Sequence, residues 1–124
     1  MTQNPSEPPT LDRSAIDELR ELVDEDTPDF LTDLLDSFLT DARQYLAALE
    51  SSNQAGDTAG VMAASHTLKS SSANLGAMKL SEFCSQIEAI SRMHSLSGVP
   101  PLIQAAQNEF IIVQKEIADL PDFD

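Results

Sequence analysis

The sequence has few of the residues that several classes of protein require. It contains no tryptophan, one cysteine (Cys84), and seven basic side chains against 21 acidic ones, so that the 124 residues carry a formal net charge of −14. A lone cysteine excludes an internal disulfide framework. The shortage of lysine and arginine argues against nucleic-acid binding and against docking on an anionic membrane, because both require a basic face. We therefore expect a small, acidic, cytoplasmic protein.

Long apolar runs are also missing. No stretch of about 18 apolar residues is present to span a membrane, and the first ten residues, MTQNPSEPPT, lack the charged and then apolar start of a signal peptide. Aromatic residues make up only 5% of the chain, and β-branched runs of alternating polarity do not occur. These features predict an all-α chain, and its length fits one domain.

Apolar residues recur at spacings of three and four along five segments, each of which predicts an amphipathic helix. Ser14, Thr27 and Asp57 are the expected N-caps, and Gly76 is the expected stop of the third helix. The expected helices cover residues 14–23, 27–50, 57–74, 78–93 and 102–120.

Four of these helices are long and have short connections, which makes consecutive helices antiparallel neighbours. We therefore predict an up-down antiparallel four-helix bundle with a short extra N-terminal helix. The expected organisation is a disordered N-terminal tail over residues 1–11, the bundle over residues 12–118 and a C-terminal tail over residues 119–124. Three prolines among polar residues are the reason to expect disorder in the first segment.

The third helix carries the residues with the most evident chemistry. His66 lies about 200° around the helix axis from the apolar Leu68, so it points away from the core. Lys69 and Ser70, at i+3 and i+4, share the face of His66. The remaining residues of that face are small or apolar and form a candidate docking face for a partner protein, namely Met62, Ala63 and Ala73.

Charge is distributed unevenly around this helix. Residues 1–57 hold fourteen acidic and three basic side chains. Residues 58–94 hold only two acidic and three basic side chains, which are Glu82, Glu88, Lys69, Lys79 and Arg92. This locally neutral-to-positive region suits an anionic group or an acidic partner pocket.

The run from His66 to Gly76, HTLKSSSANLG, resembles the signature H-x-L-K-G-S-S-x-x-L-G of the histidine-containing phosphotransfer (HPt) family. The flanking segments FLTDLLDSFLTDARQYLAAL and LSEFCSQIE also resemble that family, and the resemblance covers about residues 12–118. It implies that His66 is phosphorylated, that Lys69 lies beside the phosphoryl group, and that Glu88, 22 positions later, hydrogen-bonds the imidazole. Ser70 replaces the signature glycine, and its hydroxyl would donate to the phosphoryl oxygens.

The resemblance implies a phosphorelay intermediate, which accepts a phosphoryl group on a histidine from a receiver-domain aspartate and passes it to another receiver domain. The implied partners are response-regulator receiver domains and a sensor (hybrid) histidine kinase. No nucleotide-binding motif occurs, so we expect a phosphocarrier without kinase or ATPase activity and without a cofactor of its own. The Mg²⁺ that phosphoryl transfer requires is expected on the receiver domain, and a monomer is the simplest oligomeric state.

Two other functions are compatible with the sequence. The chain would serve as a helical module that binds a receiver domain without phosphotransfer, or as the histidine domain of a larger hybrid or chemotaxis-type kinase. Cys84 is expected to be a small buried hydrophobic residue, and His94 to meet the dipole at a helix C-terminus. His66, Cys84 and His94 lack the spacing of a zinc site, so no metal site is expected.

Overall fold

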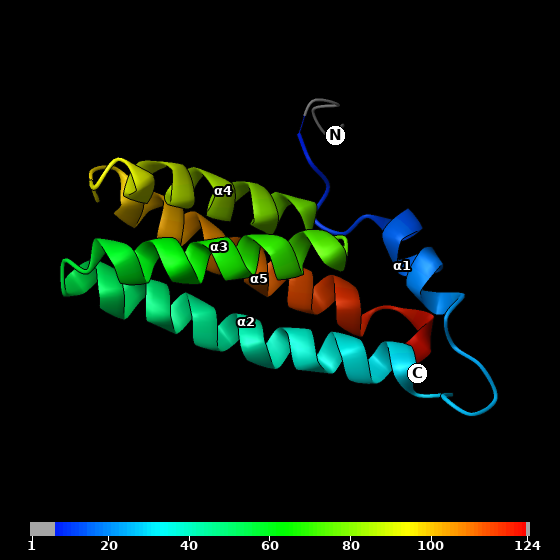
Figure 1. Cartoon of the computed structure of the whole chain (residues 1–124). Coiled ribbons are helices and arrows are strands. Elements are labelled where there is room, and N and C mark those ends of the chain that lie inside the picture. Colours follow the sequence, from blue (N-terminus) through cyan, green and yellow to red (C-terminus); the bar gives the residue numbers. More distant parts are fainter. Residues whose placement is uncertain (1–6, 124) are drawn as a thin grey trace.

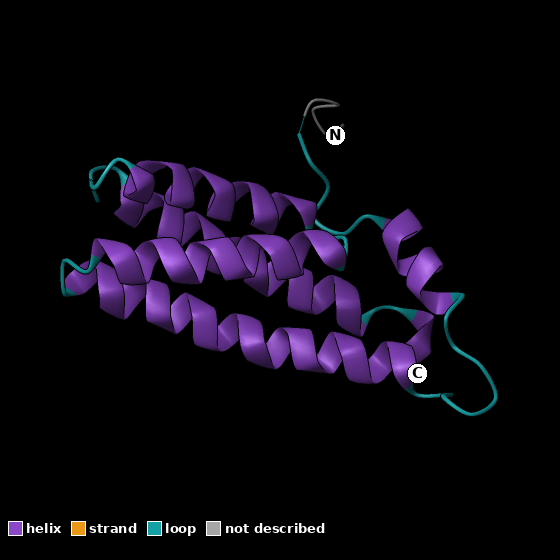
Figure 2. Cartoon of the chain, in the orientation of Figure 1, coloured by secondary structure: helices purple, strands orange, loops and turns teal. Residues whose placement is uncertain are grey.

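The computed structural model describes residues 7–123, and these residues form a bundle of helices without a strand (Figure 2). The elements are α1 (Arg13–Arg20), α2 (Phe30–Gln54), α3 (Thr58–Asn74), α4 (Met78–Arg92), α5 (Val99–Ala118) and the 3₁₀ turn η1 (Pro121–Phe123). Figure 1 shows the four long helices running side by side, with α1 across one end. Helix α3 packs against α2 and α4, and α5 closes the bundle against the same two helices. The predicted all-α four-helix bundle with a short N-terminal helix is confirmed.

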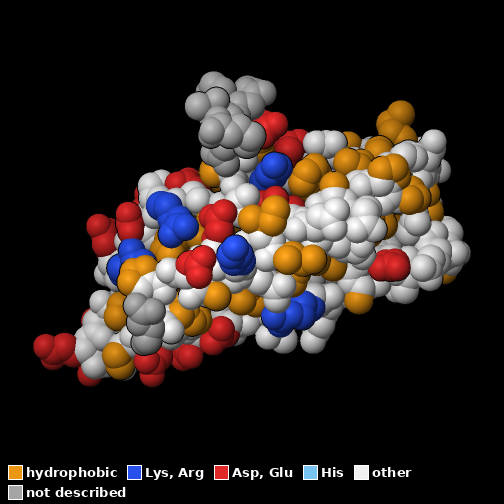
Figure 3. Space-filling view, turned by 180° about the vertical axis from the view of Figure 1, so that it is seen from behind, with side chains coloured by type: hydrophobic (Ala, Val, Ile, Leu, Met, Phe, Trp, Pro, Cys, Tyr) orange, Lys and Arg blue, Asp and Glu red, His pale blue; other side chains and the backbone are white. Residues whose placement is uncertain are grey.

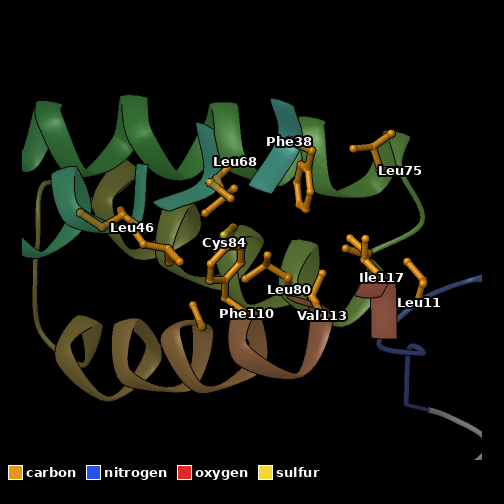
Figure 4. Close-up of a cluster of buried hydrophobic side chains, with 14 of the residues drawn as sticks. Leu11, Phe38, Leu46, Leu68, Leu75, Leu80, Cys84, Phe110, Val113 and Ile117 are labelled. Atoms are coloured by element: carbon orange, nitrogen blue, oxygen red, sulfur yellow. The ribbon is translucent and has the colours of Figure 1, made fainter. Parts of the chain in front are cut away.

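Leucine, isoleucine, valine and phenylalanine side chains from all four long helices fill the core. Figure 4 shows Leu68 of α3, Leu80 of α4 and Phe110 of α5 converging in its centre. Cys84 lies in the same cluster without solvent exposure, as predicted, and this burial raises the pKa of its thiol to about 12. The side chain therefore acts as a small hydrophobic group and not as a thiolate.

The N-cap of α1 differs from the prediction. Asp12 is the cap, because its Oδ1 accepts a hydrogen bond from the backbone N–H of Ser14 at 3.0 Å. Ser14 was the expected cap and lies in the first turn instead. An aspartate two residues before a free N–H forms this bond as readily as a serine does, so the two positions cannot be distinguished from composition alone.

Helix α2 begins at Phe30, three residues later than predicted from Thr27. The carboxylate of Asp24 accepts hydrogen bonds from the backbone N–H groups of Asp26 and Thr27, which closes a separate turn ahead of the helix. At its other end α2 continues to Gln54, so most of the predicted turn over residues 51–56 is helical.

The other connections are short. Asp57 caps α3 as predicted, since its Oδ1 accepts a hydrogen bond from the N–H of Gly60 at 2.9 Å. Helix α5 begins at Val99 and includes Pro100 and Pro101, because proline lacks only an N–H that the first turn leaves unpaired. The predicted loop over residues 94–101 is therefore shorter than expected.

The N-terminal arm, residues 7–12, is attached to the bundle. Pro9 accepts a backbone hydrogen bond from Lys79 at 2.9 Å, and Thr10 and Leu11 are buried. The prediction of disorder over residues 1–11 is thus wrong for the end of that segment, while residues 1–6 lie outside the described residues. Backbone hydrogen bonds hold the arm, and composition carries no signal for them.

The predicted C-terminal tail over residues 119–124 is also packed in its described part. Leu120 is buried, and Asp122 in η1 accepts a hydrogen bond from Arg20 Nε of α1 at 3.0 Å. This bond and the charge of Arg20 hold the pKa of Asp122 below its ordinary value, against the opposing effect of partial burial. The C-terminal turn η1 therefore contacts the last residue of α1. No helix in the described part of the chain combines the length and apolarity needed to cross a bilayer.

Gly76 joins α3 to α4 with a φ of +87°, and a Cβ at this position would lie 2.9 Å from the backbone oxygen of Asp12. We expect Gly76→Ala to lower the free energy of unfolding by more than Gly56→Ala. Gly56 also has a positive φ, +69°, but no atom lies within 4 Å of its Cβ position. The control should lose about 1–2 kcal/mol from left-handed backbone alone, and the excess at Gly76 measures the contact with the arm. Equal losses in urea unfolding would contradict this close approach.

Candidate functional site

His66 lies on the outer face of α3, as its helical phase predicts. The opposite face of α3 packs into the core through Val61, Leu68 and the small buried Ser65 and Ser72. The His66 side chain is 57% exposed, so the imidazole is accessible to another protein.

Glu88 of α4 forms a hydrogen bond with the imidazole of His66. Its Oε2 lies 2.8 Å from His66 Nδ1, which is the hydrogen bond that the family resemblance implies. A carboxylate only accepts hydrogen bonds, so we assign the ring proton to Nδ1. Nε2 is then the ring nitrogen that carries the lone pair.

Two cations share the same carboxylate. Lys69 Nζ lies 2.6 Å from Glu88 Oε1, and Arg92 Nη2 lies 2.8 Å from Glu88 Oε2. Glu88 is only 3% exposed, whereas on its own in the sequence it would be taken for one more solvated acid. Its burial between α3 and α4 therefore requires the charge compensation that these side chains supply.

The ionisation of Glu88 follows from these contacts. Burial raises the pKa of the carboxyl group, but hydrogen bonds from Lys69 and His66 and the charges of Lys69 and Arg92 act in the opposite direction and are stronger. The net pKa of Glu88 lies below its ordinary value, so the group is an anion at neutral pH.

Arg92 is the site residue that sequence analysis did not assign. The only local signal for it is its position four residues after Glu88, a spacing at which an acid and a base face each other on a helix. Many exposed pairs have this spacing. Arg92 matters to the site only because Glu88 is buried, and that burial results from the packing of α3 against α4. Gln86, two residues before Glu88, forms no hydrogen bond with the imidazole and instead donates a hydrogen bond to Glu82 Oε2 at 3.2 Å.

A hydrogen bond between α3 and α4 near the site holds the two helices at one position along their axes. Ser81 Oγ donates to the backbone oxygen of Lys69 at 2.9 Å. The turn through Gly76 and the arm bound to it hold the same two helices at their nearby ends. The carboxylate of α4 is thus placed under the imidazole of α3 by backbone contacts as well as by the ion pairs.

The structure brings together part of the predicted docking face. Met62 and Ala63 line, with His66, Glu88 and Arg92, a shallow depression of about 320 Å³. Ala73 is partly exposed two turns further along the same face and does not line this depression. Ser70 is exposed one turn after His66.

A second groove, of about 350 Å³, lies on the other side of α3 and was not predicted. It follows the seam with α2, where Leu34, Phe38, Tyr45 and Leu75 leave apolar surface beside Asp41 and Thr67. Leu34 and Tyr45 of α2 are partly exposed in this groove, whereas Phe38 is buried. Helix α3 thus has a depression on each side.

Charged side chains are unevenly distributed on the face that Figure 3 shows. Acidic and basic side chains both gather toward the end that carries α1, and few lie over the opposite end. Within residues 7–123, no group of three or more histidine, cysteine, aspartate or glutamate side chains is arranged to hold a metal ion.

The sequence of this chain matches one protein family and two characterised relatives. The model of the Hpt domain family matches residues 33–122. The chain is 27% identical over 113 residues to multistep phosphorelay regulator 1 of Schizosaccharomyces pombe, covering 91% of the chain and 38% of that protein. It is 26% identical over 106 residues to histidine-containing phosphotransfer protein 5 of Arabidopsis thaliana, covering 83% and 68%. The chain thus spans well under half of the fission-yeast protein.

Two solved structures share the fold. Histidine-containing phosphotransfer protein B of Pseudomonas aeruginosa PAO1 superposes with a TM-score of 0.79 and 33% identity, over 85% of this chain and 88% of that one. Yeast Ypd1p superposes with a TM-score of 0.82 over 93% and 96% of the two chains, and its identity of 15% supports the fold alone.

The lowered pKa of Glu88 generates a prediction about stability. An acid whose pKa is lower in the folded state stabilises the fold above its unfolded pKa, and this contribution is lost as the pH falls through the folded value. We expect Glu88→Gln to lower the free energy of unfolding at neutral pH by about 1.5–3 kcal/mol, the size of a charged hydrogen bond. The deficit should shrink as the pH falls below the ordinary value of 4.5.

The measurement is urea unfolding of both proteins at neutral and acidic pH. Glu82→Gln is the matched control, since Glu82 is exposed on the same helix. A Glu88→Gln deficit that stayed constant with pH would contradict a role for the ionised carboxylate.

Proposed function

The chain belongs to the Hpt domain family, and on that premise we propose that it is a phosphorelay intermediate whose phosphoryl carrier is His66. One observation supports the choice of this histidine most strongly. Its Nδ1 is hydrogen-bonded to a buried carboxylate, while the side chain as a whole is 57% exposed, so Nε2 is the ring nitrogen left for an approaching partner. This arrangement fixes the tautomer that leaves Nε2 as a nucleophile.

The proposed reaction is a reversible exchange with an aspartyl phosphate. The lone pair of His66 Nε2 attacks phosphorus, the Nε2–P bond forms, and the bond from phosphorus to the aspartate oxygen breaks with its electron pair returning to the carboxylate. The ring acquires positive charge while Nδ1 keeps its proton. The anionic Glu88 stabilises that charge through the existing 2.8 Å contact.

Other side chains act on the phosphoryl group. Lys69, one turn from His66, supplies a positive charge for the phosphoryl oxygens, and the exposed hydroxyl of Ser70 supplies a hydrogen-bond donor. Phosphoryl transfer needs Mg²⁺ and carboxylates that bind it, and we assign both to the receiver domain, because the described residues hold no cluster of acidic side chains arranged to bind a metal ion. We propose that the chain has no kinase or ATPase activity of its own.

The proposed partners are receiver domains of response regulators and a sensor (hybrid) histidine kinase. Receiver domains carry the aspartate that exchanges with His66, so they must approach the exposed edge of α3. The depression around Met62 and Ala63 is the proposed docking face, since it adjoins His66 and its lining includes Arg92 and no acidic side chain other than the buried Glu88.

We expect His66→Gln to abolish phosphoryl acceptance and to leave the bundle folded, because the core is untouched and Lys69 and Arg92 still compensate the buried Glu88. The donor is a receiver domain phosphorylated with acetyl phosphate and Mg²⁺, and the readout is the intact mass at neutral pH, since phosphohistidine is acid-labile. His94→Gln is the matched control and should accept phosphate normally. Labelling of His66→Gln at the wild-type level would disprove the assignment, and receiver binding by an unlabelled wild type would favour a binding module without transfer.

A bulky charge on the docking face should weaken receiver binding. Ala63→Glu introduces volume and negative charge next to His66, where an acidic receiver pocket approaches, and we expect affinity to fall by about tenfold or more. Ala73→Glu, which lies two turns from His66, should have a smaller effect. Ala47→Glu, at an exposed position of α2, is the control and should bind normally. Normal binding by Ala63→Glu, with unchanged helical circular dichroism, would move the interface to the groove between α2 and α3.

A further inference from the structure

Glu88 has two cationic partners besides the imidazole, and we propose that they have different fates in the reaction. Lys69 leaves Glu88 for the phosphoryl group when His66 is phosphorylated, and Arg92 remains as the counterion that allows Lys69 to leave. Arg92 is then a positioning residue, which acts on the reaction through Glu88. The inference rests on the proposed phosphorylation of His66.

The need for a remaining counterion follows from burial. Glu88 is 3% exposed, and a buried carboxylate that loses all of its positive partners is strongly unfavourable. If Lys69 were the only cation, its movement toward the phosphoryl group would leave Glu88 without compensation. The transfer step would then be opposed by the same carboxylate that supports the imidazole.

The geometry divides the carboxylate between the two cations. Lys69 is bound to Oε1, whereas Arg92 and His66 share Oε2. Departure of Lys69 therefore vacates one oxygen and leaves both contacts on the other intact. The imidazole keeps its orientation because the oxygen that holds it also keeps its counterion.

The backbone positions of the two cations suit these roles. Lys69 lies on α3 at i+3 from His66, so it shares the helix of the reacting group and is within reach of either the carboxylate or a phosphoryl group. Arg92 lies on α4 at i+4 from Glu88, so it shares the helix of the carboxylate. A long flexible lysine forms a single point contact, whereas the planar guanidinium is suited to a persistent one.

The test is a double-mutant cycle on the rate of transfer from a phosphorylated receiver domain to His66. Lys69→Ala should slow transfer by about tenfold to a hundredfold, in line with the loss of one charged hydrogen bond. Arg92→Gln should also slow it, because Lys69 then stays with Glu88. The double variant should be no slower than the slower single variant, whereas independent roles would multiply the two losses and overturn the proposal.

A second cycle separates action through Glu88 from direct contact with the receiver or the phosphoryl group. In a Glu88→Gln background the buried charge is gone, so Arg92→Gln should change the rate by less than about twofold. A loss as large as in the wild-type background would show that Arg92 acts elsewhere and would overturn the proposal. Arg92→Lys should restore part of the rate, since it keeps the positive charge but not the planar guanidinium.

Two controls make the outcomes distinguishable. Arg43→Gln removes an exposed arginine from α2 and should leave the rate unchanged, which accounts for the change in net charge. The loss in Arg92→Gln should appear in the maximal rate at saturating receiver, and a loss confined to the KM for the receiver would mean a docking contact and contradict the proposal. Wild-type protein that accepts no phosphate would refute the proposed function itself, whereas labelled wild type with multiplicative losses refutes only the role of Arg92.

Discussion

The structure around the site depends on one constraint, a carboxylate that is buried between two helices and must stay charged. Glu88 has access to almost no water, so its stability depends on donors that are delivered by the surrounding chain. Two of these donors, His66 and Lys69, come from α3, and the third, Arg92, comes from α4 itself. The relative position of α3 and α4 therefore decides both whether Glu88 is stable and how the imidazole is oriented.

Features far from His66 in sequence serve that relative position. The turn through Gly76 makes room for the backbone of Asp12, and the N-terminal arm adds a hydrogen bond from Asp12 to Gly76 and another from Lys79 to Pro9. Arm and turn thereby form a brace at one end of the α3–α4 pair. The Ser81 hydroxyl adds a bond within the pair. A proline-rich segment with the composition of a disordered tail is thus part of the support for the site.

The features that the sequence predicts depend on one helix, whereas those that it misses depend on contacts between helices. The outward phase of His66 and the place of Lys69 beside it follow from the 3.6-residue period of a single helix, so both are local properties and were predicted. The bond from Glu88 to the imidazole joins two helices, and only the family resemblance implied it. The burial of Glu88, and with it the relevance of Arg92, depends on how α3 and α4 pack. No spacing in the sequence determines that packing.

The separation of the core from the site explains how a phosphoryl carrier could change its charge and keep its fold. The core residues that hold the bundle together, such as Leu68 and Ile87, are fully buried and point away from His66 and its exposed face. In the proposed reaction, a phosphoryl group on His66 would lie on the outer face of α3, away from this core. Only the ion pairs of Glu88 would have to adjust. Under that proposal, a surplus of cations on one buried acid would let the charge state of His66 vary while the bundle keeps its fold.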